Sequence, residues 1–270
     1  MNNSLPGISP ARLLAITAAL LFSFPFYIHA QRGRGQQAPA TAQAAAPIDL
    51  TGYWVSLVTE DWSWRMVTPL KGSYPSVPLN AEGRKIADAW DPAKDEAEGN
   101  QCKSYGAANI MRVPTRLHIT WENENTLRMD TDAGTQTRLF NFRASQPPSS
   151  PPTWQGHSAA AWEFPTGDRG RGSRGGSLKA VTTRMRPGYL QKNGVPYSGN
   201  AVVTEHFYRT AEINGDSLLV VTTLVEDPQY LGVRPERASP GDGYGPFIRS
   251  SQFKKLADSS GWNPTPCSAR

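Results

Sequence analysis

Apolar and polar residues alternate along much of the chain, as they do in β-strands that bury one face. The clearest case is residues 115–121, where two sets of side chains point to opposite sides of an extended strand. The apolar set is Leu117, Ile119 and Trp121, and the polar set is Arg116, His118 and Thr120. Polar turns separate this segment from two similar runs. The pattern therefore predicts an antiparallel meander with strands at 115–121, 126–131 and 135–142.

Other short runs rich in β-branched and aromatic residues predict further strands. Asn214-Gly215 lies between two of these runs and is a strong signal for a hairpin. Trp62 and Trp64 follow the first run, and strand alternation would put both indoles on one face. The additional strands are predicted at 52–62, 158–164, 177–185, 201–209, 217–227 and 247–254.

Only residues 79–90 have the pattern of a helix. Asn80 is a suitable N-cap, Asp91-Pro92 ends the segment, and one face is formed by Leu79, Ile86 and Trp90. Many short strands with turns between them are typical of a sandwich or a barrel, and the regular meander favours the barrel. We therefore predict an all-β fold, a mostly antiparallel lipocalin-like (calycin-type) barrel of about 8–10 strands with one short helix.

The first 30 residues have the pattern of a secretory signal peptide. Arg12 is their only charged residue, and a largely apolar run extends from Leu13 to Ile28 before Ala30. A membrane anchor needs about 20 apolar residues, and this run is shorter and interrupted by Pro25. The sequence therefore predicts cleavage after Ala30, a periplasmic or secreted location, and no membrane association of the mature protein.

Residues 31–47 contain no large apolar side chain, so we expect a flexible spacer that packs against nothing. A single β-barrel domain is then predicted for residues 48–270. The formal net charge is +5, and Arg12, Arg32, Arg34 and the glycine-rich segment 166–176 account for the excess. We expect that segment to be solvated as well. Because a nucleic-acid-binding protein concentrates its basic residues on a folded face, nucleic acid is not a predicted partner. The sequence contains no signal for an oligomeric state.

The chain contains two cysteines, Cys102 and Cys267. In a reducing compartment they would be free thiols, whereas in an oxidising one an even number suggests a disulfide. Cys267 ends a proline-rich segment with no other evident anchor, which favours the disulfide. Closing so long a loop would stabilise the fold by about 4–5 kcal/mol in the chain-entropy model.

Several short motifs resemble those of a known family. Gly52-Tyr53-Trp54 is similar to the G-x-W opening of lipocalins, although no C-terminal helix is predicted after the barrel strands. The remaining motifs are Trp154-Gln155-Gly156-His157-Ser158, Trp162-Glu163, Val203-Thr204-Glu205-His206-Phe207, Glu226-Asp227-Pro228-Gln229-Tyr230 and Thr265-Pro266-Cys267. Together they resemble a widespread group of exported bacterial lipocalin-like barrel proteins of unassigned function. The resemblance covers residues 48–267 and implies a barrel and export, but it supplies no catalytic residues.

Three residues are candidates for acid–base catalysis. His157 would share a strand face with Ala159, Ala161 and Glu163, and we expect this face to line the barrel interior, with the alternative that His157 binds a loop carbonyl. Glu205 lies between apolar neighbours, so it is either a buried acid with a raised pKa or a surface residue at a barrel end. His118 is the third candidate. His157 does not activate Ser158, because adjacent strand residues point to opposite faces.

Candidate ligand-binding residues are basic or aromatic. Arg116 and Arg138, with His118, would favour a carboxylate, enolate or phenolate ligand if they face the interior; the alternative is a solvated outer face. Trp121, Trp154 and Tyr230 would suit an apolar or ring-bearing molecule. No histidine pair has metal-ligand spacing, so neither a metal nor another cofactor is predicted; the alternative is a metal held by His118, His157 and His206 from three separate strands.

Two functions remain, and a purely structural role is a third. The first is an exported barrel that binds a small, partly apolar or aromatic molecule, with an anionic ligand as one option. The alternative is a cofactor-independent lyase, isomerase or hydratase that transfers protons through His157 or Glu205. Clustering of His157, His118 and Glu205 in one cavity would favour the enzyme.

Overall fold

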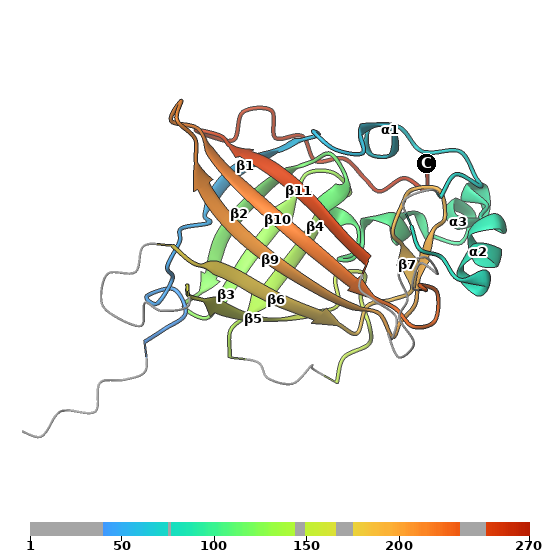
Figure 1. Ribbon diagram of the computed structural model, residues 1–270, viewed down its shortest axis with the longest axis horizontal. Helices are drawn as coiled ribbons and strands as arrows, with labels where there is room; N and C mark the ends of the chain where they lie inside the picture. Colours follow the sequence, from blue (N-terminus) through green and yellow to red (C-terminus); the bar gives the residue numbers. More distant parts are fainter. Residues whose placement is uncertain (1–39, 75–76, 144–148, 166–174, 233–246) are drawn as a thin grey trace, which may run out of the picture. The chain divides into compact units, whose positions relative to one another are not determined.

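The chain folds into a closed β-barrel, as the alternation of its residues predicts. The computed structural model describes residues 40–74, 77–143, 149–165, 175–232 and 247–270. Within these residues, nine strands close the barrel in the order β1-β11-β10-β9-β6-β5-β4-β3-β2 (Figure 1). The strands are β1 (Gly52–Leu57), β2 (Arg116–Asn123), β3 (Thr126–Thr131), β4 (Gln136–Asn141), β5 (His157–Glu163), β6 (Ser177–Thr183), β9 (Val202–Ala211), β10 (Ser217–Glu226) and β11 (Phe247–Lys255).

The strand pairing confirms the predicted meander and hairpin. β2, β3 and β4 pair in sequence as antiparallel neighbours. β9 and β10 form a long antiparallel hairpin around Asn214-Gly215, where Gly215 has a φ of 87° that suits glycine. One pair, β4 with β5, is parallel and joins Phe140 to Ser158. The barrel is therefore mostly antiparallel.

Alternate side chains of the strands fill the barrel interior. Leu117 and Ile119 of β2 point inward, as their apolar pattern predicts, and are almost fully buried. Other side chains of the same core are Trp54, Leu127, Met129, Phe140, Leu178, Phe207, Leu219, Val221 and Phe253. At one end, which we call the aromatic end, the rings of Trp121, Phe142 and Trp162 pack together.

Short helices and a small second sheet gather at the opposite end, which we call the capped end (Figure 1). The caps are α1 (Trp62–Arg65), α2 (Ala81–Asp88), α3 (Pro92–Ala97), the 3₁₀ turns η2 (Gln101–Tyr105) and η3 (Ile110–Arg112), and the paired strands β7 (Gly188–Tyr189) and β8 (Pro196–Tyr197). Ile110 and Met111 of η3 are buried in the barrel core, so this turn acts as a plug. Among the helices of the described residues, none is long and apolar enough to cross a bilayer.

The helix predicted at 79–90 is α2, with Asn80 as its N-cap accepting from the Gly83 N–H at 2.8 Å. Its buried side differs from the expected one, because Gly83 and Ala87 face inward while Ile86 is exposed. A Cβ at Gly83 would lie 2.5 Å from a backbone carbonyl oxygen, so only glycine allows this close approach. The expectation that Trp62 and Trp64 extend a strand is wrong, since both lie in α1.

The folded unit begins before the boundary expected at residue 48. The Ala42 N–H donates to the Asn125 side chain at 3.1 Å, and the Trp162 indole donates to the Ala42 carbonyl at 2.7 Å. Residues 40–47 therefore pack against the aromatic end, which corrects the prediction that they contact nothing. The predicted signal peptide, the rest of the spacer and most of the loop at 166–176 lie outside the described residues.

The disulfide predicted between Cys102 and Cys267 is present, with its Cα atoms 5.1 Å apart. It ties the C-terminal tail, residues 256–270, to η2. The tail also pairs with the β3–β4 turn through Thr265 and Ala133, and its Ala269 N–H donates to Glu96 of α3 at 2.7 Å. The tail thus runs along the outer wall of the barrel toward the capped end (Figure 1).

Candidate functional site

Two of the candidate residues meet inside the barrel. Arg138 of β4 and Glu205 of β9 have fully buried side chains and form two parallel hydrogen bonds of 2.5 and 3.1 Å. Arg138 also donates to Thr182 at 3.4 Å, and the hydroxyls of Thr182 and Ser158 are 2.7 Å apart. Glu205 is therefore buried and not a surface residue at a barrel end, and both of its oxygens accept from one guanidinium. That arrangement neutralises the carboxylate rather than presenting it as a base.

His157 does not face the interior, which corrects the orientation expected for β5. Ser158 is buried and bonds to Thr182 inside, so its neighbour His157 points outward. Glu163, on the same outer face, bonds to the His206 ring at 2.9 Å. The Nε2 atom of His157 is buried and has no hydrogen-bond partner among the described residues, so the alternative bond to a carbonyl is not formed through this atom.

His118 also faces outward, away from Glu205. The three acid–base candidates therefore share no cavity, which removes the observation that would have favoured the enzyme. In the described part of the chain, no three His, Cys, Asp or Glu side chains are grouped closely enough to hold a metal ion.

The aromatic candidates lie in three separate places. Trp121 packs with Phe142 at a ring distance of 5.7 Å in the aromatic end. The ring of Trp154 lies under the Arg186 guanidinium at 4.0 Å. Tyr230 lies beside α2, where its carbonyl accepts from the Asn80 N–H. These residues do not form one ligand site, and each has a packing role of its own.

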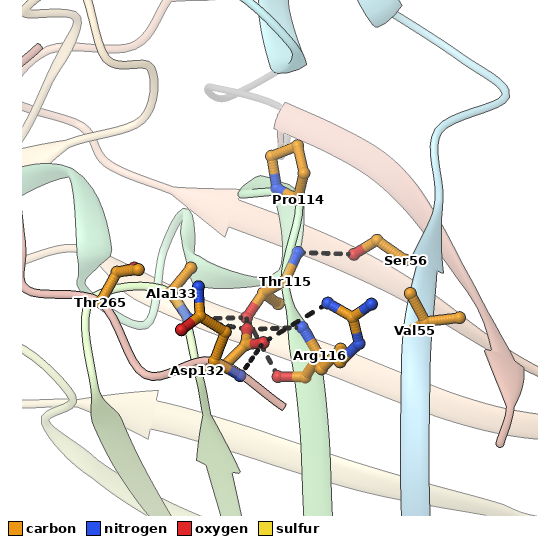
Figure 2. Close-up of a pocket in the computed structure, with 9 residues that line it drawn as sticks. Val55, Ser56, Pro114, Thr115, Arg116, Asp132, Ala133 and Thr265 are labelled. Carbon is orange, nitrogen blue, oxygen red and sulfur yellow. Dashed lines mark hydrogen bonds and ion pairs between the residues drawn. The ribbon is translucent and has the colours of Figure 1, made fainter. Parts of the chain in front are cut away.

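A pocket of about 290 Å³ lies on the outer wall, between the barrel and the tail (Figure 2). Its walls come from β1, from the segment that leads into β2, from the β3–β4 turn and from the tail. The lining residues are Val55, Ser56, Pro114, Thr115, Arg116, Asp132, Ala133, Asn263 and Thr265. Among these lining residues, Arg116 is the one that the sequence predicts to bind a ligand.

Strand pairing positions one side of the pocket. Val55 of β1 lies opposite Arg116 of β2 in the antiparallel register. One step further, the Ser56 N–H donates to the Thr115 carbonyl at 3.0 Å, and the Thr115 N–H donates to the Ser56 hydroxyl at 3.1 Å. The Ser56 hydroxyl keeps its own proton, so it can still donate to a ligand.

Asp132 joins the chain segments that line the pocket through its hydrogen bonds. One of its oxygens accepts from the Thr115 hydroxyl at 2.8 Å and from the N–H groups of Arg116 and Ala133 at 2.7 and 2.8 Å. The other oxygen accepts from the Asn263 N–H at 3.4 Å, which brings the tail into the same network. Asp132 is buried, and its negative charge is spread over these framework donors. It is therefore a structural centre of the pocket.

Arg116 is the positively charged group of the pocket. The nearest approach of its guanidinium to Asp132 is 3.8 Å, which is too long for a hydrogen bond. Its Nε atom is buried and, within the described chain, has no acceptor. The side chain is 35% exposed, so the guanidinium remains accessible from the pocket. Arg116 can therefore donate hydrogen bonds to a bound anion.

An aromatic cluster borders the pocket. The rings of Tyr53 and His118 stack at 4.1 Å with an interplanar angle of 4°, and Trp262 of the tail meets both edge-on at 5.9 and 6.2 Å. Tyr53 and His118 lie two residues from Val55 and Arg116 on the same outward faces, because side chains on one face recur every second residue. His118 thus belongs to the surroundings of the pocket.

Sequence reasoning missed the other polar residues of the pocket. Asp132 lies in the turn between two predicted strands, and its four donors come from three separate segments of the chain. Asn263 and Thr265 reach the pocket only because the tail is tethered by the disulfide and by its pairing with Ala133. No family model matches this sequence, and no curated protein matches it either.

Proposed function

We propose that this protein is an extracytoplasmic β-barrel that binds a small, partly aromatic anion in the outer-wall pocket. The observation that carries the proposal is the pocket itself, where Arg116, with no hydrogen-bond acceptor for its buried Nε atom, lines the same space as the hydroxyl-bearing residues Ser56, Thr115 and Thr265. Such a combination of one charged group and few directed polar groups is typical of small-molecule sites.

The volume of the pocket limits the size of the ligand. The space of about 290 Å³ is open to solvent on one side. A monocyclic molecule fits this space, whereas a long-chain lipid or a dinucleotide would extend out of it. The pocket is also at the low end of the usual range for ligand sites, about 300–1,000 Å³.

Charge and ring chemistry narrow the ligand class. Arg116 favours a carboxylate or phenolate, since a guanidinium donates two parallel hydrogen bonds to such groups. The adjacent rings of Tyr53, His118 and Trp262 favour a ring or another flat apolar group next to the anion. Extracytoplasmic location is supported by the signal-like N-terminus and by the disulfide, which forms and persists in oxidising compartments.

The test is a binding screen with one matched pair of variants. Monocyclic carboxylates and their neutral amides are screened by thermal shift, and hits are measured by calorimetry. Arg116→Gln is compared with Arg128→Gln on β3, whose side chain is similarly exposed, at 38% against 35%, but lies outside the pocket. We expect carboxylates to bind, and Arg116→Gln to weaken them at least tenfold, about 1.4 kcal/mol, with Arg128→Gln unchanged.

Two outcomes would reject the proposal. One is equal binding of the acids and their amides, which would mean that no positively charged side chain contributes to binding of the carboxylate. The other is an equal loss in both arginine variants, which would indicate a general surface effect. The melting temperature of Arg116→Gln without ligand shows whether this variant is folded. We expect it to fold, because Asp132 retains its other donors.

A further inference from the structure

Three arginines are buried together at the capped end, and none of them lines the outer-wall pocket. Arg65 comes from α1, Arg112 from η3 and Arg249 from β11, and each is only 6–7% exposed. α1 follows Asp61, whose φ of 50° turns the chain so that Arg65 enters the end of the barrel. We call this group the arginine cluster.

The carboxylates that accompany the cluster lie at its solvent edge. Arg65 pairs with Glu60 at 2.5 Å, and Arg112 pairs with Asp61 at 2.7 Å. The side chains of Glu60 and Asp61 are 32% and 37% exposed, so water screens their charges. The negative charge therefore lies on the outer side of the cluster.

Arg249 has no carboxylate partner within the described residues. Its Nη1 donates to the Leu190 carbonyl at 2.6 Å and to the Asn109 side chain at 3.3 Å, and its guanidinium lies 4.1 Å from the centre of the Phe247 ring. Burial, and then repulsion by Arg112, lowers the pKa of Arg249 well below its ordinary value. Burial also lowers the pKa of Arg65, with Arg112 adding to the effect and Glu60 opposing it.

Two guanidinium nitrogens in the cluster have no acceptor. The Nη2 atoms of Arg65 and Arg249 are buried and lack a hydrogen-bond partner in the part of the chain that the structure describes. Native proteins satisfy nearly all such buried donors. A cluster with surplus donors and surplus positive charge is therefore complementary to an anion.

A small cavity lies beside these side chains. It has a volume of about 10 Å³, and its lining consists of Trp64, Arg65, Asn109, Arg112, Val113, Gln191 and Lys192. Arg249 reaches the lining through its bond to Asn109. A cavity of this size holds about one water-sized body, so a carboxylate, phosphate or sulfate ion does not fit. Lys192 adds a further positive charge to the wall.

We propose that the arginine cluster binds one monatomic anion of halide size. The ion accepts hydrogen bonds from the buried guanidinium groups and offsets the repulsion between Arg112 and its two neighbours. Because the three arginines belong to three separate elements, the ion also joins α1 and the η3 plug to the barrel wall.

The first experiment measures thermal stability of the full chain at constant ionic strength. Sodium chloride or bromide replaces sodium gluconate, whose anion is too large for the cavity. We expect a saturable rise in melting temperature with halide that gluconate does not produce. Superimposable curves in halide and gluconate would overturn the proposal.

Variants locate the effect. Arg65→Gln should shift the halide midpoint at least tenfold, whereas Arg209→Gln, on β9 and partly exposed beside Asp49, should leave it unchanged. Arg116→Gln should retain the full halide response, so this site and the proposed ligand pocket fail or succeed independently. An equal response in Arg65→Gln and Arg209→Gln would contradict the assignment.

Anomalous diffraction from bromide-soaked crystals supplies a readout that needs no variant. We expect a bromide peak between Arg65 and Arg112, within about 3.5 Å of a guanidinium nitrogen. Bromide peaks confined to the protein surface, with none in the cluster, would overturn the proposal even if Arg65→Gln fails to fold.

Discussion

The buried Arg138–Glu205 pair allows a sharp test of the barrel interior. In Glu205→Gln, Arg138 keeps its charge in a site with no exposure, beside Phe140 and with one long bond to Thr182. Removing one partner of a buried ion pair costs about 3–5 kcal/mol, because the other charge stays buried and unpaired. For a domain of this size that corresponds to a fall in melting temperature of roughly 6–20 °C.

The double variant separates charge burial from packing. Arg138→Met with Glu205→Leu removes both charges while filling a similar volume, so it should be neutral or more stable than the parent by about 1–4 kcal/mol. Denaturant unfolding followed by tryptophan fluorescence, with the disulfide intact, measures all variants. Arg128→Met is the surface control, since an exposed pair such as Arg128–Asp130 contributes only about 0–1 kcal/mol.

Two results would refute this reasoning. A Glu205→Gln loss as small as that of Arg128→Met would mean that Arg138 can reach water or another partner. A double variant as unstable as the single one would mean that side-chain shape, not unpaired charge, determines the cost. Either result would mean that an unpaired buried charge is not the source of the loss.

Three further predictions concern single structural features. Replacing Cys102 and Cys267 with serine opens a link across 165 residues and should cost about 5 kcal/mol in the chain-entropy model, read from the guanidinium midpoint; a loss below about 1 kcal/mol would show that the tail is held by its other contacts. Asn80→Ala should cost about 1 kcal/mol by urea unfolding through loss of the α2 cap, and no loss would mean that water replaces the side chain. Gly134→Ala should destabilise the protein more than Gly72→Ala in the same assay. Both glycines have positive φ, but only at Gly134 would a Cβ meet a tyrosine ring, at 2.3 Å. Equal losses of stability would show that the ring moves aside.

Local patterns predicted much of the barrel. In β2, large apolar and polar side chains alternate without exception from Arg116 to Trp121, and the structure places the apolar set inside. The Asn214-Gly215 turn fixed the β9–β10 hairpin because glycine tolerates the positive φ that the turn needs. These features depend on neighbouring residues only, so the sequence expresses them directly.

β5 shows where local reasoning fails. Its residues are mostly small, so neither face of the strand is distinctly apolar, and the orientation chosen from His157 was one residue out of phase. Ser158 faces inward because the Thr182 hydroxyl of β6 is its polar partner there, and Thr182 in turn accepts from Arg138 of β4. Orientation was thus decided by residues distant in the sequence.

The arginines illustrate the same limit. Arg116 and Arg138 each lie in an alternating strand, yet one faces outward and the other is buried. Arg138 is buried because Glu205, 67 residues away, neutralises it. Nothing local to β4 marks this difference, and the arginine cluster likewise requires α1, η3 and β11 to converge.

The outer-wall pocket depends on a covalent bond as much as on the barrel. Strand pairing and Asp132 build its floor, but Asn263 and Thr265 belong to a proline-rich tail whose largest apolar residue is Trp262. Such a tail has little surface to bury, so its position relies on the Cys102–Cys267 bond and the short pairing with Ala133. In a compartment that keeps thiols reduced, one wall of the pocket would lose its tether while the barrel retained its strands. The location implied by the N-terminal sequence and the integrity of the proposed site are therefore linked through one disulfide.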